Sequence, residues 1–386
     1  MRSTPARFNF RCASRLLYIR RMSKKLRVGI LFGGRSAEHE VSLQSAKNII
    51  DAIDKNTYEV VLIGIDKNGG WHLDEGSRFL LRTTESELRE LPASGENLAL
   101  VPGKREEQLV ALSGQQTLGS LDVVFPVLHG PLGEDGTVQG LLKLANIPFV
   151  GAGVLGSAVG MDKDVMKRLL RDADIPIARF IVLNKYSATE VDFDDARDQL
   201  GLPLFIKPAN LGSSVGINKV RDREEFDRAV RDAFKYDNKV LIEECIDGRE
   251  IECSVLGNAQ PVASVLGEIL PRHEFYSYEA KYLDENGAVL EIPAKIPREI
   301  SERIRQTAIK TFRVLCCEGM ARVDFFLRND EEIIVNEINT IPGFTRISMY
   351  PKLWEASGLS YSELIDRLIG LATERFEREK RLKSQR

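Results

Sequence analysis

Acidic and amide side chains near the C-terminal end of the chain have the types and spacing of ligands for a hard divalent cation. Asp324 lies in one run of strand-forming residues, and Glu337 and Asn339 lie in the next. Carboxylate and amide oxygens, with no Cys or His nearby, suit Mg²⁺ that is carried in on nucleotide phosphates. The pattern predicts a site for a phosphate-bound metal ion; the alternative is a solvated face of an edge hairpin.

A β-hairpin is the element that would bring these side chains together. The runs Val323 to Leu327 and Ile333 to Ile338 are rich in β-branched and aromatic residues, which predicts two strands joined by a polar turn. We expect the loop to be Asn329 to Glu332.

That loop length fixes which residues of the two strands face each other. It places Asp324 opposite Glu337 and Arg322 opposite Asn339. Because side chains alternate along a strand, all four would lie on one face of the hairpin.

Composition limits the class of protein. With 386 residues the chain is long enough for two or three domains, and 43% hydrophobic with 29% charged residues is ordinary for a globular protein. A net charge of -3 provides no field for binding nucleic acid, and no apolar run reaches the roughly 18 residues that span a bilayer. Five cysteines, two of them adjacent, do not form a disulfide framework, so a reducing cytosol fits best.

Residues 1–22 differ from the rest because the first 21 contain six arginines and no acid. Two interpretations stay open: a transit peptide, and a disordered or non-native extension before a start at Met22. We favour the extension, because the segment has no apolar central region and a globular domain begins at Lys25.

The first domain is predicted to be α/β with a parallel sheet. A buried strand from Leu26 to Phe32 is followed by Gly33-Gly34, a helix through Ile53 and a second strand, Tyr58 to Ile65. The stretch 66–120 is expected to hold a Gly-rich turn, a charged helical segment and a polar linker, without recognisable chemistry. In such sheets ligands bind at the carboxyl ends of strands.

A third buried strand, Leu121 to Leu128, leads into a polar, glycine-rich segment that runs from His129 to Gly136. A ligand role and a structural role are both open for His129. None of the Gly clusters has the dinucleotide fingerprint, so NAD is not indicated.

The middle of the chain predicts a phosphate-binding unit. A helix is expected from Asp162 to Ala173, with Lys163 and Lys167 among the charged residues away from its apolar face. A strand from Leu204 to Ile206 delivers Lys207, and the small residues from Gly212 to Gly216 follow. Backbone N–H groups of such a loop can surround phosphate oxygens, although a flexible hairpin loop is the other interpretation.

Two further segments suit a nucleotide. The strand Lys239 to Glu243 ends in two acids, and Glu250 could hold ribose hydroxyls. Phe275 to Tyr282 has three tyrosines and Lys281, and predicts a lid whose lysine stabilises a transferring phosphoryl group. Edge-strand acids and aromatic loop packing are the corresponding alternatives.

Taken together, these motifs resemble the ATP-grasp carboxylate-amine ligases, and among them the D-alanine:D-alanine ligases, from about Lys25 to Leu371. The likeness rests on six segments in the family's order: Gly33 to Ser42, His129 to Gly136, Met161 to Lys163, Lys207 to Gly216, Tyr278 to Tyr282, and Glu337 to Ser348.

The resemblance implies an ATP-grasp fold of three α/β domains. They are an N-terminal parallel-sheet substrate domain at 23–152, a central lid domain at 153–243 and a C-terminal domain with the metal site at 244–375, followed by a polar tail at 376–386. It also implies ligation of two D-alanine molecules through an acyl phosphate, for peptidoglycan precursor synthesis, in a cytoplasmic homodimer.

For the amino-acid substrates, the resemblance implies that Glu38 holds the amino group of the first D-alanine and that His129 lies near its carboxylate. Ser348 would bind the carboxylate of the second D-alanine. Arg322 and the backbone N–H of Gly343 would stabilise the charge that develops on the acyl centre.

For ATP, the resemblance implies a set of binding residues drawn from the middle and the C-terminal parts of the chain. Phosphates would be contacted by lysines and by a closing loop, and adenine and ribose by the strand-end acids and their neighbours. The residues are Lys163, Lys207, Ser213, Ser214, Val215, Glu243, Glu244, Ile246, Glu250, Lys281 and Asn336.

For the metal, the resemblance implies two Mg²⁺ or Mn²⁺ ions held by Asp324, Glu337 and Asn339. Ser213, Tyr282 and Glu38 would form a hydrogen-bonded chain beside the attacking amine. In the family, ligases with Tyr at the position of Tyr282 tend to make the dipeptide, which favours a peptide ligase here. The alternative is a ligase of the D-alanyl-D-lactate type. Another ATP-grasp enzyme is a further alternative, but Glu38, Tyr282 and Ser348 belong to the dipeptide site. A catalytically silent nucleotide-binding protein would be expected to lose metal ligands, and all are present here.

Overall fold

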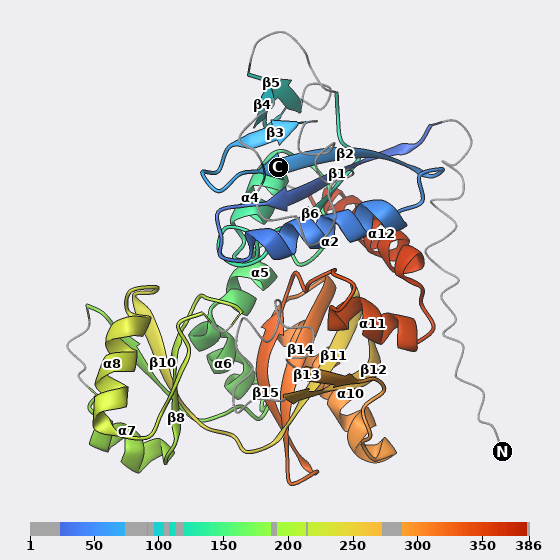
Figure 1. The fold of residues 1–386 in the computed structure, drawn as a ribbon. Helices are drawn as coiled ribbons and strands as arrows, with labels where there is room; N and C mark the ends of the chain where they lie inside the picture. Colours follow the sequence, from blue (N-terminus) through green and yellow to red (C-terminus); the bar gives the residue numbers. More distant parts are fainter. Residues whose placement is uncertain are drawn as a thin grey trace, which may run out of the picture.

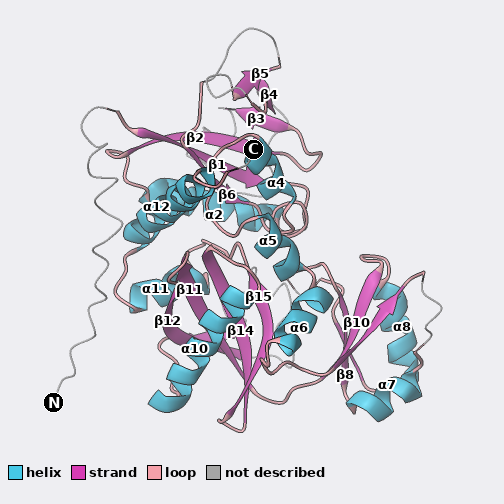
Figure 2. Cartoon of the chain, turned by 180° about the vertical axis from the view of Figure 1, so that it is seen from behind, coloured by secondary structure: helices cyan, strands magenta, loops and turns pink. Residues whose placement is uncertain are grey.

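The computed structural model describes residues 24–73, 91, 96–103, 108–112, 119–186, 191–213, 215–271 and 288–383. In this part of the chain three β-sheets follow one another, each with helices packed on it (Figures 1 and 2). The α/β class expected from the sequence is therefore confirmed. No helix in the described ranges is both long and apolar enough to cross a membrane. The predicted extension at 1–22 lies outside these ranges.

The first sheet has six strands in the order β5-β4-β3-β2-β1-β6. Strand β1 lies between β2 and β6 and is parallel to both, as predicted, and β2 has the expected bounds. Strands β3, β4 and β5 extend the sheet in antiparallel fashion, which the sequence did not predict for the stretch 66–120. The bounds are β1 Leu26–Gly33, β2 Tyr58–Ile65, β3 Trp71–Leu73, β4 Glu96–Leu100, β5 Leu109–Ala111 and β6 Val123–Val127.

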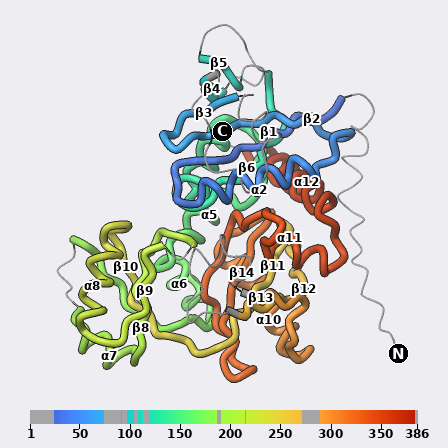
Figure 3. The backbone as a smooth tube through the Cα atoms, in the orientation of Figure 1, coloured from blue at the N-terminus to red at the C-terminus, as the bar shows by residue number. Residues whose placement is uncertain are grey.

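Helices cover both faces of the first sheet. On one face, α2 (His39–Ala52) shares an apolar core with α12 (Tyr361–Lys380), the last helix of the chain. Figure 3 shows this red helix lying beside the blue N-terminal segment. On the other face, Val138 and Leu142 of α4 (Thr137–Leu144) pack against the sheet. Helix α12 thus completes the N-terminal core and continues into the expected polar tail.

The second sheet is antiparallel, with the order β7-β10-β8-β9. Two helices lie on one face, and their apolar residues form a separate core with the strands. The bounds are β7 Phe180–Asn184, α7 Phe193–Leu200, β8 Leu204–Pro208, β9 Asn218–Val220, α8 Arg223–Ala233 and β10 Lys239–Glu244.

The third sheet is antiparallel, with the order β13-β12-β11-β14-β15. Helix α10 covers one face and α11 contributes Met349 and Leu353 to a cluster on the other. The bounds are β11 Arg249–Gly257, β12 Val262–Pro271, β13 Ala288–Glu291, α10 Arg298–Val314, β14 Gly319–Arg328, β15 Glu332–Asn339 and α11 Met349–Ala356.

Helices α5 (Val154–Met161) and α6 (Lys163–Asp172) connect the first sheet to the other two. Met166 and Leu170 of α6 are fully buried in the core of the third sheet. Helix α6 therefore stands between the second and third sheets, with its N-terminus close to the loop that follows β8.

Candidate active site

The hairpin of β14 and β15 has the predicted facing pairs. Asp324 pairs with Glu337 and Arg322 pairs with Asn339. The predicted four-residue loop is wrong: Arg328 pairs with Glu332, so the turn has three residues, and Asn329 and Asp330 adopt positive φ in it. A bulge at Asn336, which has no partner in the ladder, restores the register at the acidic pair.

Side chains of opposite charge surround the carboxylates of this hairpin. Asp324 accepts hydrogen bonds from Arg322 Nε and Nη2, both at 2.7 Å, and from Asn339 Nδ2 at 2.9 Å. Arg322 Nε also lies 2.9 Å from a carboxylate oxygen of the buried Glu252. Glu337 Oε2 lies 3.5 Å from Lys163 Nζ.

These residues fit a hard metal ion. Two carboxylates and an amide meet on one half-buried face, and cations now neutralise the carboxylates. Among the described residues, no group of three or more His, Cys, Asp and Glu side chains forms a complete metal cage. Mg²⁺ that binds together with a nucleotide usually keeps phosphate oxygens and waters among its ligands. Such an ion does not need a complete cage of protein ligands.

Lys163 joins the second sheet to the hairpin. As the first residue of α6, it donates from its backbone N to the carbonyl of Ala209 at 3.0 Å, and from Nζ to the carbonyl of Leu211 at 2.7 Å. The same amino group lies beside Glu337. Lys163 thus holds the loop after β8 against the predicted metal site.

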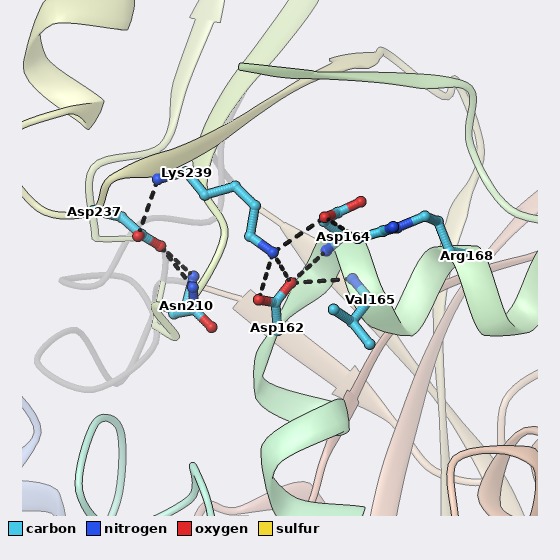
Figure 4. Close-up of polar contacts among 7 residues, drawn as sticks. All are labelled: Asp162, Asp164, Val165, Arg168, Asn210, Asp237 and Lys239. Carbon is cyan, nitrogen blue, oxygen red and sulfur yellow. Dashed lines mark hydrogen bonds and ion pairs between the residues drawn. The ribbon is translucent and has the colours of Figure 1, made fainter. Parts of the chain in front are cut away.

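A cluster of acids around Lys239 fixes the start of α6, as Figure 4 shows. Asp162 caps the helix by accepting from the backbone N of Asp164 and of Val165. Lys239 Nζ, from β10, lies 2.6 Å from Asp162 Oδ2 and 3.1 Å from Asp164 Oδ2. A cation of the second sheet is therefore bound to the helix that packs on the third.

The loop after β8 is fixed in the same region. Asp237 accepts from the backbone N of Asn210 at 2.8 Å and from its Nδ2 at 2.9 Å, and also from the backbone N of Lys239 (Figure 4). The segment that follows Lys207 is therefore held at both sides, by Asp237 and by Lys163.

Lys207 lies in a buried ion cluster that the sequence analysis did not predict. Glu243 accepts from Lys207 through one carboxylate oxygen, and its other oxygen contacts Lys167 Nζ. Lys167 was predicted only to lie away from the apolar face of the helix, and the structure shows that its side chain is buried, with 1% exposed. Its place four residues after Lys163, on the same face of α6, was the signal available in the sequence.

The charges of this cluster control its ionisation. Burial alone would raise the pKa of Glu243, but the two lysine cations hold that pKa at about 2. Burial lowers the pKa of Lys167, although Glu243 opposes that effect. Glu243 is therefore a carboxylate near neutral pH.

Glu38 and Ser213 connect the first sheet to the phosphate loop. Glu38 precedes α2 and is 8% exposed, and Ser213 Oγ donates to its carboxylate. Ser213 itself has φ +52°. A Cβ on Gly130 would lie 2.8 Å from Glu38 Oε2, and Gly130 has φ +74°, so a larger residue would be strained there and would displace this carboxylate.

His129 is buried next to the loop that follows β15. Its Nδ1 lies 3.0 Å from the carbonyl oxygen of Ile341 and 3.9 Å from Glu134 Oε1. Burial alone would lower the pKa of His129, but the nearby carboxylates of Glu134 and Glu38 and the hydrogen bond to Ile341 raise that pKa above the usual value. The raised pKa favours the protonated imidazole, which can attract a carboxylate.

The loop with Gly343 and Ser348 is held by α2. Ser45 Oγ accepts from the backbone N of Phe344, and Asn48 Nδ2 donates to the Phe344 carbonyl. Ser348 Oγ lies 2.8 Å from the place that a Cβ on Gly343 would occupy, and it accepts from the backbone N of Thr345 at 3.0 Å. The Ser348 hydroxyl is thus close to the Gly343 backbone.

Other predicted residues lie elsewhere or outside the described ranges. The carboxylate of Glu244 binds Arg179 and does not join the lysines. Ile246 is buried in a small apolar cluster, and Glu250 and Asn336 are half-buried on β11 and β15. Ser214, Lys281 and Tyr282 lie outside the described residues.

The second and third sheets, with the cationic strand end and the acidic hairpin between them, form the ATP-grasp fold, preceded by a sheet domain with parallel strands. Solved structures share this arrangement. The "D-alanine-D-alanine ligase from Coxiella burnetii" has a TM-score of 0.82 and 41% identity, over 93% of this chain and 97% of that one. The "VanG D-Ala:D-Ser Ligase from Enterococcus faecalis" has a TM-score of 0.80 and 36% identity, over 90% and 100%.

Sequence comparisons identify the family within this class. The family model described as "D-ala D-ala ligase N-terminus" matches residues 27–152, and "D-ala D-ala ligase C-terminus" matches residues 169–370. A "D-alanine--D-alanine ligase" of Shouchella clausii is 60% identical over 363 residues, which cover 94% of this chain and 98% of the relative. The chain belongs to the D-alanine–D-alanine ligase family.

Proposed function

We propose that this protein joins two molecules of D-alanine with ATP, through an acyl phosphate, and releases D-alanyl-D-alanine, ADP and phosphate. The observation that carries the proposal is the contact between Lys163 and Glu337. It brings a cation that faces the loop after β8 beside the acidic pair of the hairpin, as phosphoryl transfer requires. The likeness to the ligases described above supports the choice of substrates.

Binding of the first D-alanine is assigned to the first sheet. The carboxylate of Glu38 would hold the ammonium group, and His129, when protonated, would attract the carboxylate. Both side chains are almost fully buried, so these charges act in a medium of low dielectric constant. The hydrogen bond from Ser213 to Glu38 would hold the phosphate loop closed over this substrate.

Binding of ATP is assigned to the facing residues of the second and third sheets. Lys163 and Lys207 would neutralise phosphate oxygens, and the backbone N–H groups near Ser213 and Val215 would surround them. The strand end at Glu243 and Ile246 would border adenine, and Glu250 would hold the ribose. Ser214, Glu244, Asn336 and Lys281 remain assigned to the nucleotide by resemblance alone.

Asp324, Glu337 and Asn339 would hold the divalent ions, Mg²⁺ or Mn²⁺, which supply charge neutralisation at the transferring phosphoryl group when bound. Arg322 would then be free of Asp324 but still paired with Glu252. In that position its guanidinium and the Gly343 N–H would stabilise the oxyanion that forms when the second amine attacks the acyl carbon. Ser348 would bind the carboxylate of the second D-alanine.

The test is release of ADP and phosphate by the full chain with ATP and Mg²⁺. We expect the release to depend on D-alanine and not on L-alanine, with the dipeptide identified by its mass. No D-alanine-dependent phosphate release would refute the proposal.

The second substrate is the point on which a related activity differs. The likeness to a D-Ala:D-Ser ligase makes D-serine a second candidate, and a D-lactate-using ligase is the other. We expect D-alanine to win when it competes at equal concentration with D-serine or D-lactate at pH 7.5. A mixed dipeptide or an ester as the main product would overturn this assignment.

We also propose that the enzyme works in the cytoplasm as a homodimer and supplies peptidoglycan synthesis. Four cysteines of the described ranges are free thiols, and burial raises the pKa of Cys253 and Cys317. Free thiols, two of which are made less reactive by burial, suit a reducing compartment that also contains ATP. Light scattering during gel filtration tests the dimer, since a mass near 43 kDa would show a monomer.

A further inference from the structure

A buried cluster of two lysines and one carboxylate has more positive than negative charge. Lys167 and Lys207 each contact a different oxygen of Glu243. The exposed fractions of the side chains are 1% for Lys167, 11% for Lys207 and 2% for Glu243. When both lysines are protonated, two cations share one anion and these three side chains carry a surplus of one positive charge. Glu337, which also pairs with Lys163, is a further carboxylate whose charge acts on Lys167.

A surplus buried charge is costly unless another group compensates it. Among described residues, the Lys167 amino group makes no hydrogen bond of acceptable geometry, although its nitrogen lies in ionic contact with Glu243. If Lys207 leaves Glu243 for an external anion, the remaining pair is neutral. The net charge of the three side chains thus suits a site that binds an anionic ligand.

The two lysines differ in their freedom to move. Lys167 lies in the middle of α6, between Met166 and Leu170 in the sequence, and the latter two are fully buried. Lys207 lies near the end of β8, where the chain enters the loop that reaches Ser213. The positions therefore make Lys167 the fixed partner and Lys207 the exchangeable one.

We propose that Lys167 is a positioning residue for nucleotide binding: it remains paired with Glu243 when Lys207 turns from Glu243 to the phosphates of ATP. This inference rests on the proposed function. Without Lys167, the departure of Lys207 would leave Glu243 as an unpaired buried carboxylate. Lys207 would then stay with Glu243, and ATP would bind more weakly.

The experiment measures the affinity of full-length variants for ATP with Mg²⁺ by calorimetry, together with the melting temperature. In K167M an apolar chain of similar length replaces the buried cation, and Lys207 with Glu243 forms a neutral pair, so we expect a folded protein. Its Kd for ATP should rise about tenfold or more, because a buried charge pair must be broken. The KM for D-alanine should change little.

Two further variants separate the charge from the general effect of a substitution in α6. K167R keeps the cation and should bind ATP within about threefold of the unaltered protein, because the charge that neutralises Glu243 is kept. R171M removes an exposed cation of the same helix and should leave the affinity unchanged. Equal affinity of K167M and the unaltered protein would overturn the inference.

A double variant tests whether Lys167 acts through Glu243. In E243Q no carboxylate holds Lys207. The ATP affinity of K167M/E243Q should therefore be less than about threefold below that of E243Q. The double variant should also bind ATP more tightly than K167M does. A purely structural Lys167 would make the double variant as weak as K167M or weaker, which would overturn the inference. If K167M does not fold, the comparison of E243Q with the double variant decides. If the unaltered protein itself binds no ATP, the proposed function fails rather than this assignment.

Discussion

The link between Lys239 and the start of α6 leads to a prediction for the variant K239M. Lys239 Nζ contacts Asp162 at 2.6 Å and Asp164 at 3.1 Å, and its side chain is 19% exposed. Removal of one partner of a fully buried ion pair costs about 3–5 kcal/mol. Here both carboxylates keep other donors, because Asp162 still caps the helix and Asp164 still binds Arg168. We therefore expect a loss of about 2 kcal/mol, at the lower end of truncation costs for charge pairs.

The expected loss has two readouts. For a cooperative unit of this size it corresponds to a fall of about 2–3 °C in melting temperature, which scanning calorimetry can resolve. The helix that begins with Lys163 would also be held less firmly against the loop after β8. The KM for ATP should therefore rise several-fold, while the KM for D-alanine changes less.

Lys235 provides the matched control. Its Nζ lies 3.0 Å from Asp232 on the surface, and its side chain is 71% exposed. Because an exposed ion pair contributes at most about 1 kcal/mol, K235M should leave both readouts unchanged within error. If K239M melts no lower than K235M and has the same KM for ATP, the link between the second sheet and α6 has no energetic role and the reasoning fails.

Three other perturbations have defined outcomes. D324N should lower kcat about 100-fold or more, because an amide is a poorer metal ligand than a carboxylate. Its melting temperature should fall by no more than a few degrees. Phosphate release measured at several Mg²⁺ concentrations checks this prediction, and an unchanged kcat contradicts it. The pKa of His129 lies above its usual value, so the stabilisation from its charged form is complete below about pH 6.5 and disappears as the pH rises through the raised pKa. In urea unfolding, H129Q should therefore lose most stability near pH 6 and less at higher pH. A difference in unfolding free energy between H129Q and the unaltered protein that grows with pH would refute the sign. Arg375 donates to the carbonyl oxygens of Gly151 at 2.5 Å and Phe149 at 2.7 Å. R375M leaves both buried acceptors without this donor, so it should lower the free energy of unfolding by about 3 kcal/mol. A melting temperature equal to that of the unaltered protein would show that these bonds do not hold α12.

Local sequence patterns predicted much of the fold. The buried runs at β1, β2 and β6 have strand residues between turn residues, and the parallel pairing follows from the helix between the first two. The hairpin register at Asp324 and Glu337 was also predicted correctly, although for an incomplete reason. A shorter turn and a bulge at Asn336 cancel each other, and the sequence alone gives no measure of either.

The features that the sequence analysis missed depend on contacts between distant segments. Strands β3, β4 and β5 are only three to five residues long, and each is added to the sheet by pairing with the strand before it, β3 with β2, β4 with β3 and β5 with β4. The burial of Lys167 was not predicted, because a lysine is rarely buried unless it is paired and its partner Glu243 lies 76 positions further on, on β10 of the second sheet. The roles of Ser214, Lys281 and Tyr282 remain predictions from sequence.

The packing of α12 on the first sheet affects how the protein can be made and recombined. Leu364, Ile365, Leu368 and Ile369 complete a core whose other residues come from the first third of the chain, among other segments. During synthesis the apolar face of the N-terminal sheet is therefore not fully covered until α12 has been made. A chimera that exchanges the N-terminal domain with that of a relative should take the matching last helix with it.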